Sequence, residues 1–274
     1  MGGALDDARI RIERAKAGRE RLKDEIAAWR SAHPNAFGVV PDWDEHHLMR
    51  MHDGRIRLLA RVEASPPKAW GLLVGDILGD MRSALDYAVY ALAVANTRLD
   101  PPPDEKWLEF PIATTEAWFR EKRVQRKLSG LSVQARDYIE SVQPYQPGFG
   151  GPSGVTSPLW LLNEMVGPSK HRFIPVFWTM LHSTQLQFMP GINATFSDMR
   201  AYRHGTELID GTPLVDLKLA VTAQNAAIPL GASITPYVAF RPSTNLPASG
   251  EVYMELGKIG GPVEDVVNHL EAFM

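Results

Sequence analysis

The stretch Trp70-GLLVGDILGDMRSALDYAVYALAVA-Asn96 decides the fold of this chain. It is a long apolar run without proline, and at about 100° per residue its apolar side chains fill one side of a helix. Its polar side chains that gather within roughly 80° of one another are Asp76, Asp80, Ser83, Tyr87 and Tyr90. Because a buried polar group needs a hydrogen-bond partner or a function, this predicted helix is the first place to look for a site.

The composition is that of an ordinary globular protein and excludes several chemistries. The chain has 274 residues, of which 45% are hydrophobic and 22% are charged. It has no cysteine, which excludes disulfides, a thiol nucleophile and cysteine-ligated zinc. With a formal charge of −3, a nucleic-acid partner would need a local concentration of Lys and Arg. We interpret the two basic runs, residues 9–23 and 120–127, as solvated helix faces in preference to binding patches.

The sequence gives no sign of a membrane partner. The first residues, MGGALDDARIRIERAK, are charged from Asp6 onward and contain no apolar core of a signal peptide. The most apolar segment, 70–96, is interrupted by Asp76, Asp80, Arg82 and Asp86, which disfavours a membrane span. We therefore expect a cytoplasmic protein.

Further helices and one β-hairpin are predicted on either side of 70–96. Residues 4–32 lack proline and favour a long amphipathic helix. His52-Asp53-Gly54 separates two strand-like runs, 46–51 and 55–62, and Asp-Gly in this position is a strong hairpin signal. We expect helices over 114–128, 131–142 and 160–166, the last continuing to 181 after disturbances at Gly167-Pro168 and Pro175.

From His182 onward the pattern changes to short alternating runs separated by turns. These runs predict strands over 185–189, 194–198, 214–222, 234–241 and 252–256, followed by a short helix over 263–273. The fold class is therefore α+β, with a mainly helical unit over 1–181 that includes the hairpin at about 46–62. An antiparallel β-rich region with a terminal helix, 182–274, is expected to pack with the first unit as one body.

Polar residues of the 70–96 helix are candidates for acid–base chemistry. Two carboxylates one turn apart raise each other's pKa when both are buried, and Arg82 can pair with Asp86 four residues later. The catalytic candidates are Asp80, Arg82, Asp86 and Tyr87, with Asp76 and Ser83 as binding residues. In the alternative interpretation these side chains brace neighbouring segments through hydrogen bonds.

A second polar group lies in Trp160-LLNEMVGPSKH-Arg172. Asn163, Glu164 and Lys170 are candidate binding residues, and His171 is a candidate general base. If the helix were continuous, Glu164, His171 and His182 would share a face, because seven and eleven residues are close to whole turns. We therefore expect a polar site between helix 70–96 and helix 158–181.

Five pieces of the chain resemble a widespread family of uncharacterised bacterial proteins with GDxLxxLRSALDH, FPI, QPY and (N/D)KHR motifs in this order. The pieces are Leu73-VGDILGDMRSALD-Tyr87, Phe110-Pro111-Ile112, Gln143-Pro144-Tyr145, Leu159-WLLN-Glu164 and Lys170-His171-Arg172. In that family the first motif commonly reads Arg-x4-His, a spacing similar to that of HEPN-type helical domains, some of which are metal-independent RNases. This sequence has Tyr87 in place of that histidine, so only Arg82 of the pair remains.

Metal and cofactor sites are not expected. The acids and histidines of residues 42–47 and His52 have a spacing without metalloenzyme precedent, and we interpret them as a solvated hairpin surface. Neither GxGxxG nor GxxxxGK[ST] occurs, so no nucleotide-phosphate loop is predicted.

Three functional hypotheses follow from these residues. The first is a metal-free, cofactor-free hydrolase of a small molecule, with His171, Asp80 or Asp86 as general base and Arg82 or Lys170 stabilising negative charge. The second is a divergent HEPN-like protein that acts on RNA or as a toxin, which would require a homodimer and a basic groove. In the third, the same residues bind a small-molecule ligand without catalysis.

Overall fold

The computed structural model describes residues 5–42, 51–52, 55–148, 157–169, 176–188, 194–201, 207–221, 230–240 and 250–274. The long helices are α1 (Asp6–Ala32), α2 (Lys68–Thr97) and α7 (Val252–Leu270), and η3 (Glu271–Phe273) continues from α7. The short ones are η1 (Glu105–Trp107), α3 (Glu116–Phe119), α4 (Lys122–Arg126), α5 (Val133–Ser141) and α6 (Pro158–Ser169). The strands are β1 (Phe37–Pro41), β2 (Met51–His52), β3 (Arg55–Val62), β4 (Val176–Phe188), β5 (Ala194–Ala201), β6 (Pro213–Val221) and β7 (Leu230–Phe240).

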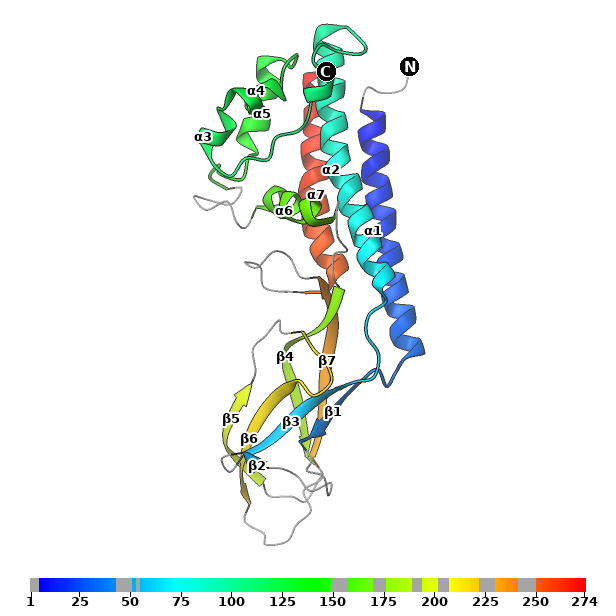
Figure 1. The fold of residues 1–274 in the computed structure, drawn as a ribbon, viewed down its shortest axis with the longest axis vertical. Helices are drawn as coiled ribbons and strands as arrows, with labels where there is room; N and C mark the ends of the chain where they lie inside the picture. Colours follow the sequence, from blue (N-terminus) through cyan, green and yellow to red (C-terminus); the bar gives the residue numbers. More distant parts are fainter. Residues whose placement is uncertain are drawn as a thin grey trace.

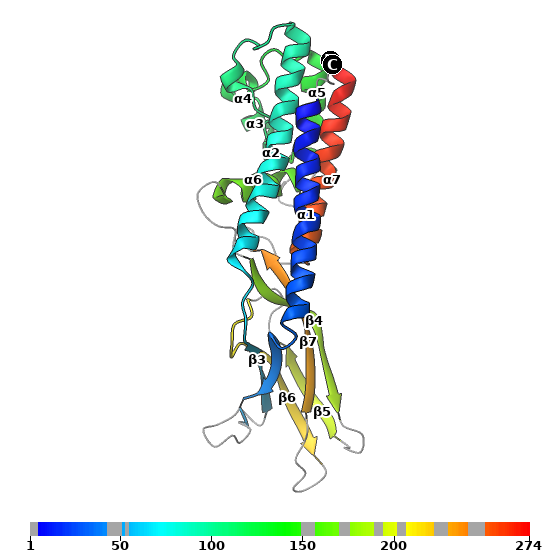
Figure 2. The same ribbon diagram turned by 90° about the vertical axis from the view of Figure 1, so that its right-hand side faces the viewer.

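The molecule is elongated, with helices at one end and strands at the other (Figure 1). Helices α1, α2 and α7 lie side by side along the long axis, and α1 is antiparallel to the other two (Figure 2). The start of α1 and the end of α7 therefore lie at the same end of the molecule. The short helices α3, α4 and α5 lie beside α2 and α7 near that end, and α6 packs on α2 and α7 closer to the strands.

The strands form two antiparallel sheets. Four strands follow the order β1-β3-β6-β5, with β2 also paired to β3, and a second sheet consists of β4 and β7. The predicted hairpin is confirmed, because Met51 pairs with Ile56 and His52 with Arg55. Strand β3 of this hairpin pairs with β6, so the first sheet takes strands from both sides of the expected division at residue 181.

The three long helices enclose the main hydrophobic core. In α2 the fully buried side chains include Val74, Leu78, Leu85 and Leu92, which recur at helical spacing. Burying a leucine or valine contributes about 1.5–3 kcal/mol, so a continuous stripe of this kind holds a helix firmly on its neighbours. The predicted helix 70–96 is thereby confirmed within two residues at its start and one at its end.

The last helix begins earlier than the sequence pattern predicts. Residues 252–256, predicted as a strand, form the first turns of α7, and the helix continues through Gly260-Gly261-Pro262. Proline within a helix costs about 3 kcal/mol. The buried side chains that offset this cost are Val252, Leu256, Ile259, Val263, Val266, Val267 and Leu270, spaced three and four residues apart.

The predicted continuation of helix 160–166 to residue 181 is wrong. Helix α6 runs through Gly167 and Pro168 to Ser169, but residues 176–188 form β4. Val176 pairs with Phe240 and Phe188 with Leu230, so distant pairing decides the state of this apolar run. Glu164 and His182 therefore do not share a helix face. The other strands predicted here, 185–189, 194–198, 214–222 and 234–241, are confirmed over their described residues as parts of β4, β5, β6 and β7, and residues 189, 222 and 241 lie outside the described residues.

The α+β class is confirmed, with antiparallel sheets beside a helical bundle. Among the described residues, no helix combines the length and the apolar character that crossing a membrane requires.

Candidate functional site

The polar side chains of α2 divide into two groups that contact different neighbours. Asp80 and Tyr87 face α1, whereas Arg82 and Asp86 face the segment 108–113. Asp80 and Arg82 are two residues apart and therefore point about 160° apart around the helix. The predicted catalytic residues thus do not form one group.

Asp80 joins α2 to α1. Its side chain is buried, with oxygens 2.8 Å from Nη1 of Arg11 and 3.4 Å from Nε of Arg14. The guanidinium of Arg11 also lies over the ring of Tyr87, 5.5 Å from its centroid. Hydrogen bonds with Asp80, first, and with Tyr87 raise the pKa of Arg11. Asp80 and Tyr87 are therefore engaged in an interhelical contact.

Arg82 is the centre of a second group, the Arg82 cluster, which consists of Arg82, Asp86, Glu109 and Lys127. Its Nη2 donates to Oε1 of Glu109 and to the carbonyl oxygen of Phe110, both at 2.6 Å, and lies 3.0 Å from Oδ1 of Asp86. Lys127 Nζ contacts the other oxygen of Glu109 at 2.6 Å. Arg82 Nη1 is buried and has no hydrogen-bond partner among the described residues. The cluster contains two cations and two carboxylates, so its charges balance.

Asp86 completes the attachment of Phe110 to α2. Its Oδ1 accepts a hydrogen bond of 2.9 Å from the backbone N–H of Phe110, while Arg82 donates to the carbonyl of the same residue. Both backbone polar groups of Phe110 are thus satisfied by side chains one helical turn apart on α2. The side chain of Phe110 is fully buried in the core.

The sequence pieces Phe110-Pro111-Ile112 and Gln143-Pro144-Tyr145 meet at this segment. Gln143 is fully buried, accepts a hydrogen bond of 2.7 Å from the N–H of Ala113 and donates one of 2.8 Å to the carbonyl of Ile139. Nearby, Tyr145 donates to Glu140, and burial together with this hydrogen bond raises the pKa of Tyr145 to about 12. Arg82 and Asp86 hold one end of residues 110–113 and Gln143 holds the other, so these side chains have a structural role here.

Burial raises the pKa of Asp86, and the Arg82 charge and the N–H of Phe110 only partly oppose this effect. A raised pKa means that the folded protein binds a proton more tightly than the unfolded chain. The stability that Asp86 contributes is therefore fully present below its ordinary pKa of 3.8 and is lost as the pH rises through the higher pKa of the folded state.

We expect the Asp86→Asn variant to gain stability relative to the natural protein as the pH rises from about 4 to about 7. The amide oxygen can still accept from Phe110, and asparagine has no ionised form to desolvate. Thermal unfolding of both proteins across this range measures the difference, with Asp76→Asn as the control for an exposed carboxylate on the same helix. A difference in melting temperature between the two proteins that does not change with pH would contradict the raised pKa of Asp86.

The remaining predicted site residues lie apart from both groups. Asp76 is exposed, Ser83 is half-buried, Asn163 on α6 is exposed and Glu164 is half-buried. Helix α6 does pack against α2, as the predicted site requires. Lys170 and His171 lie outside the described residues, as do His46 and His47 of the hairpin.

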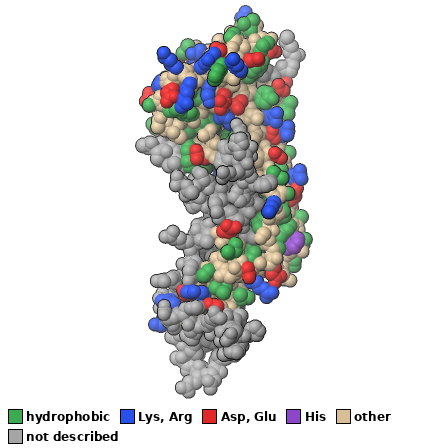
Figure 3. All heavy atoms as spheres, viewed as in Figure 1, with side chains coloured by type: hydrophobic (Ala, Val, Ile, Leu, Met, Phe, Trp, Pro, Cys, Tyr) green, Lys and Arg blue, Asp and Glu red, His purple; other side chains and the backbone are tan. Residues whose placement is uncertain are grey.

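The basic run 120–127 is matched by acids. Figure 3 shows Lys, Arg, Asp and Glu side chains intermingled over the α3–α5 end of the molecule. The ion pairs there are Arg120 with Glu140, Arg123 with Glu121, Arg126 with Asp104 and Lys127 with Glu109. These pairs fit the interpretation of a solvated, charge-balanced surface better than that of a nucleic-acid groove.

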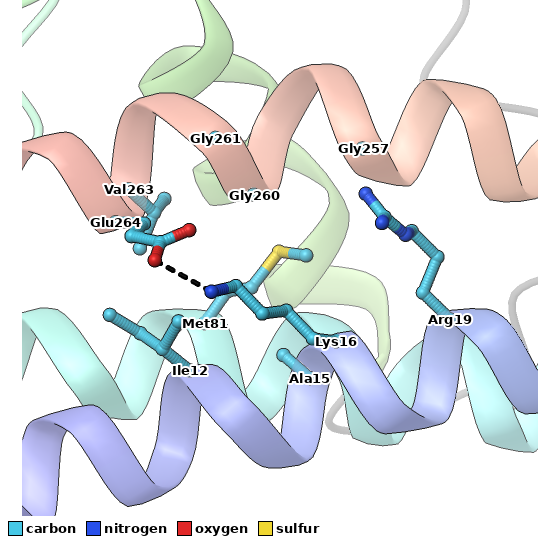
Figure 4. Close-up of a pocket in the computed structure, with 10 residues that line it drawn as sticks. All are labelled: Ile12, Ala15, Lys16, Arg19, Met81, Gly257, Gly260, Gly261, Val263 and Glu264. Carbon is cyan, nitrogen blue, oxygen red and sulfur yellow. Dashed lines mark hydrogen bonds and ion pairs between the residues drawn. The ribbon is translucent and has the colours of Figure 1, made fainter.

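A pocket lies between α1 and α7, and we call it the α1–α7 pocket (Figure 4). Its volume is about 150 Å³, comparable to cavities that hold a benzene molecule. Its apolar lining consists of Ile12, Ala15, Met81 and Val263, and its charged lining of Lys16, Arg19 and Glu264. The remaining wall is the backbone of α7 at Gly257, Gly260 and Gly261.

The glycines of α7 create this space. At Gly260 an added Cβ would come within 2.9 Å of Cε of Met81, and at Gly257 within 2.7 Å of Nη1 of Arg19. Any larger side chain at these positions would have to displace Met81 or Arg19. Because these glycines carry no side chain, a pocket remains between α1 and α7.

Sequence reasoning did not identify this pocket. The basic run 9–23 was interpreted as a solvated face, but Lys16 contacts Glu264 of α7 at 2.6 Å and Arg19 lies against Gly257. The glycines lie between the strand expected over 252–256 and the helix expected over 263–273, so the prediction did not place them in a helix. The spacing of glycine at 257, 260 and 261 within an apolar helical period was the signal that could have indicated it.

Within the described residues, no three His, Cys, Asp or Glu side chains lie close enough together to hold a metal ion. Comparison with known proteins finds no matching family, no matching curated protein and no matching solved structure.

Proposed function

We propose that this protein binds a small organic molecule in the α1–α7 pocket without transforming it. The observation that supports this proposal is an apolar cavity of about 150 Å³ whose floor is the thioether of Met81. Ligand pockets are mostly apolar with a few placed polar groups, which is the character of this lining. A flexible methionine at the floor adapts to different ligand shapes.

The size and chemistry of the lining restrict the ligand. A volume of this size suits one aromatic ring or a short alkyl chain. Among the described residues that line the pocket there is no serine, histidine or cysteine to act as a nucleophile or general base. Lys16 and Glu264 neutralise each other at 2.6 Å. This composition favours binding over catalysis.

The hydrolase hypothesis is less favoured by the geometry of α2. Nη2 of Arg82 donates to Glu109 and to the carbonyl of Phe110, and Asp86 accepts from the backbone of the same segment. A general base needs access to a substrate proton, and an oxyanion donor needs a free N–H at the reacting atom. If an activity were found, its loss in Asp86→Asn without loss of stability would restore the catalytic interpretation.

A variant that fills the pocket tests the proposed function. We expect phenylacetate or 2-phenylethanol to raise the melting temperature of the natural protein by about 3–5 °C at tenfold above the dissociation constant. Gly260→Leu should abolish this shift, since its side chain would occupy the cavity after displacing only the tip of Met81. Differential scanning fluorimetry measures both proteins.

Gly79→Leu is the matched control. Gly79 lies on α2 with nothing within 4 Å of an added Cβ, and it does not line the pocket. The control gains the same helix propensity as Gly260→Leu and should keep the full ligand response. An equal response in Gly260→Leu, or no response to either compound in the natural protein, would overturn the proposal.

A further inference from the structure

Ion pairs join α1 to α7 and to the residues that flank α7 at either end, along the seam between these antiparallel helices. The pairs, each with a nitrogen–oxygen distance of 2.6 Å, are Arg9 with Glu271, Lys16 with Glu264 and Arg30 with Glu251. Seven residues separate the first two cations and the first two acids, which is close to two helical turns. The next cation, Arg30, is 14 residues beyond Lys16 and its acid, Glu251, is 13 residues before Glu264, so the seam follows an approximate repeat of seven residues.

This repeat lacks an acid at one position on α7. Seven residues before Glu264 the chain has Gly257, which carries no side chain. The equivalent cation on α1 is Lys23, which pairs with Glu20 of its own helix at 3.1 Å. Along the described length of α7, no carboxylate pairs with Arg19 or Lys23. One interhelical ion pair is thus missing beside the α1–α7 pocket.

Two cations share a single carboxylate at this position. Glu20 contacts both Arg19 and Lys23 at 3.1 Å, and its pKa is lowered by Lys23, first, and by Arg19. Arg19 also lines the pocket and lies across Gly257, where the missing acid would be (Figure 4). Lys16 contacts Glu264 at 2.6 Å and Glu13 at 3.0 Å, whereas Arg19 is the cation of the pocket lining without an acid from α7.

We infer that the ligand of the α1–α7 pocket is a small carboxylate whose apolar part contacts Met81 and whose head group pairs with Arg19 beside Gly257. This inference rests on the proposed function, because it names the chemistry of the ligand for the same pocket. The carboxylate takes the position that an acidic side chain at residue 257 would have in the repeat. A guanidinium offers two parallel donors to such a group.

Two probes of the same shape isolate the contribution of the head group. Phenylacetate and 2-phenylethanol share the ring and the carbon spacer, and only the first carries a charge. We expect phenylacetate to bind the natural protein about fivefold more tightly, since the pair with Arg19 is partly exposed to solvent. Isothermal titration calorimetry at low ionic strength measures both dissociation constants.

Arg19→Met should remove this preference while leaving 2-phenylethanol binding unchanged, because methionine keeps an apolar stem without the charge. Arg21→Met is the matched control, since Arg21 is on the same helix, is 70% exposed and pairs with Glu25 away from the pocket. A preference that persists in Arg19→Met, or one that disappears equally in Arg21→Met, would overturn the inference.

Gly257→Glu provides a second test, because it places an acid where the repeat lacks one. The nearest atoms to a new Cβ belong to the flexible end of Arg19, which can move to accept the carboxylate. We expect the preference for phenylacetate to vanish in Gly257→Glu and to remain in the neutral variant Gly257→Gln. A preference retained in Gly257→Glu would contradict the inference.

The affinities of the two probes distinguish failure of the carboxylate inference from failure of the proposed function. Equal affinity of the natural protein for the two probes would overturn the carboxylate head group and leave the apolar pocket in place. Binding of neither probe would overturn both.

Discussion

Replacing Arg82 with methionine is expected to lower the free energy of unfolding by about 3–5 kcal/mol. The substitution leaves the carbonyl of Phe110, the partly buried Asp86 and one oxygen of Glu109 without their shared donor. Removing one partner of a buried ion pair is costly because the remaining charge stays desolvated. Urea unfolding followed by circular dichroism measures the loss.

Arg120→Met is the control for the loss of an arginine in this part of the protein. Arg120 is 56% exposed and pairs with Glu140 on the surface, so its replacement should cost no more than about 1 kcal/mol. Arg82→Lys keeps the charge but replaces the planar guanidinium with an ammonium on a shorter side chain, and an intermediate loss is expected. If Arg82→Met lowers the free energy of unfolding by less than about 1 kcal/mol, Arg82 does not hold the segment 108–113. Arg82 would then be a catalytic candidate again.

Replacing Gln143 with methionine is expected to cost about 2–4 kcal/mol, because two buried backbone groups lose their partners together. The N–H of Ala113 loses its acceptor and the carbonyl of Ile139 loses its donor. Methionine is close to glutamine in shape, so the packing at this fully buried position changes little.

Urea unfolding reports the cost, and amide hydrogen exchange at Ala113 reports whether the segment is released locally. Gln134→Met is the control, since Gln134 is exposed on α5 and should change stability by less than about 0.5 kcal/mol. Unchanged exchange at Ala113 in Gln143→Met would contradict the role assigned to this side chain.

The elements that the sequence predicts best are those with strong local patterns. Helix α2 has a continuous apolar stripe and no proline, and the hairpin has Asp-Gly between two strand-like runs. The first part of β4, residues 176–181, was expected as helix because its apolar residues suit a buried helix as well as a strand, and only pairing with β7 decides between them. Helix α7 begins at Val252 and not at residue 263 as expected, because buried residues on both sides of Pro262 outweigh the cost of the proline.

The division of the polar residues on α2 could not be predicted from its sequence. The periodicity of the helix places Asp80 and Arg82 on different sides, but it does not say which neighbours lie there. The partner of Asp80 is Arg11, 69 positions away, and that of Arg82 is Glu109, 27 positions away. The pocket depends on a still longer separation, since Lys16 and Glu264 are 248 positions apart.

The most direct test of the proposed ligand site is a methyl NMR titration of the protein with labelled methionines. Met81 lies at the floor of the α1–α7 pocket, whereas Met254 is 54% exposed on α7 outside it. Met81→Leu and Met254→Leu assign the two signals. We expect phenylacetate to shift the Met81 signal in a saturable way and to leave the Met254 signal in place. Saturable binding without a change at Met81 would contradict the account.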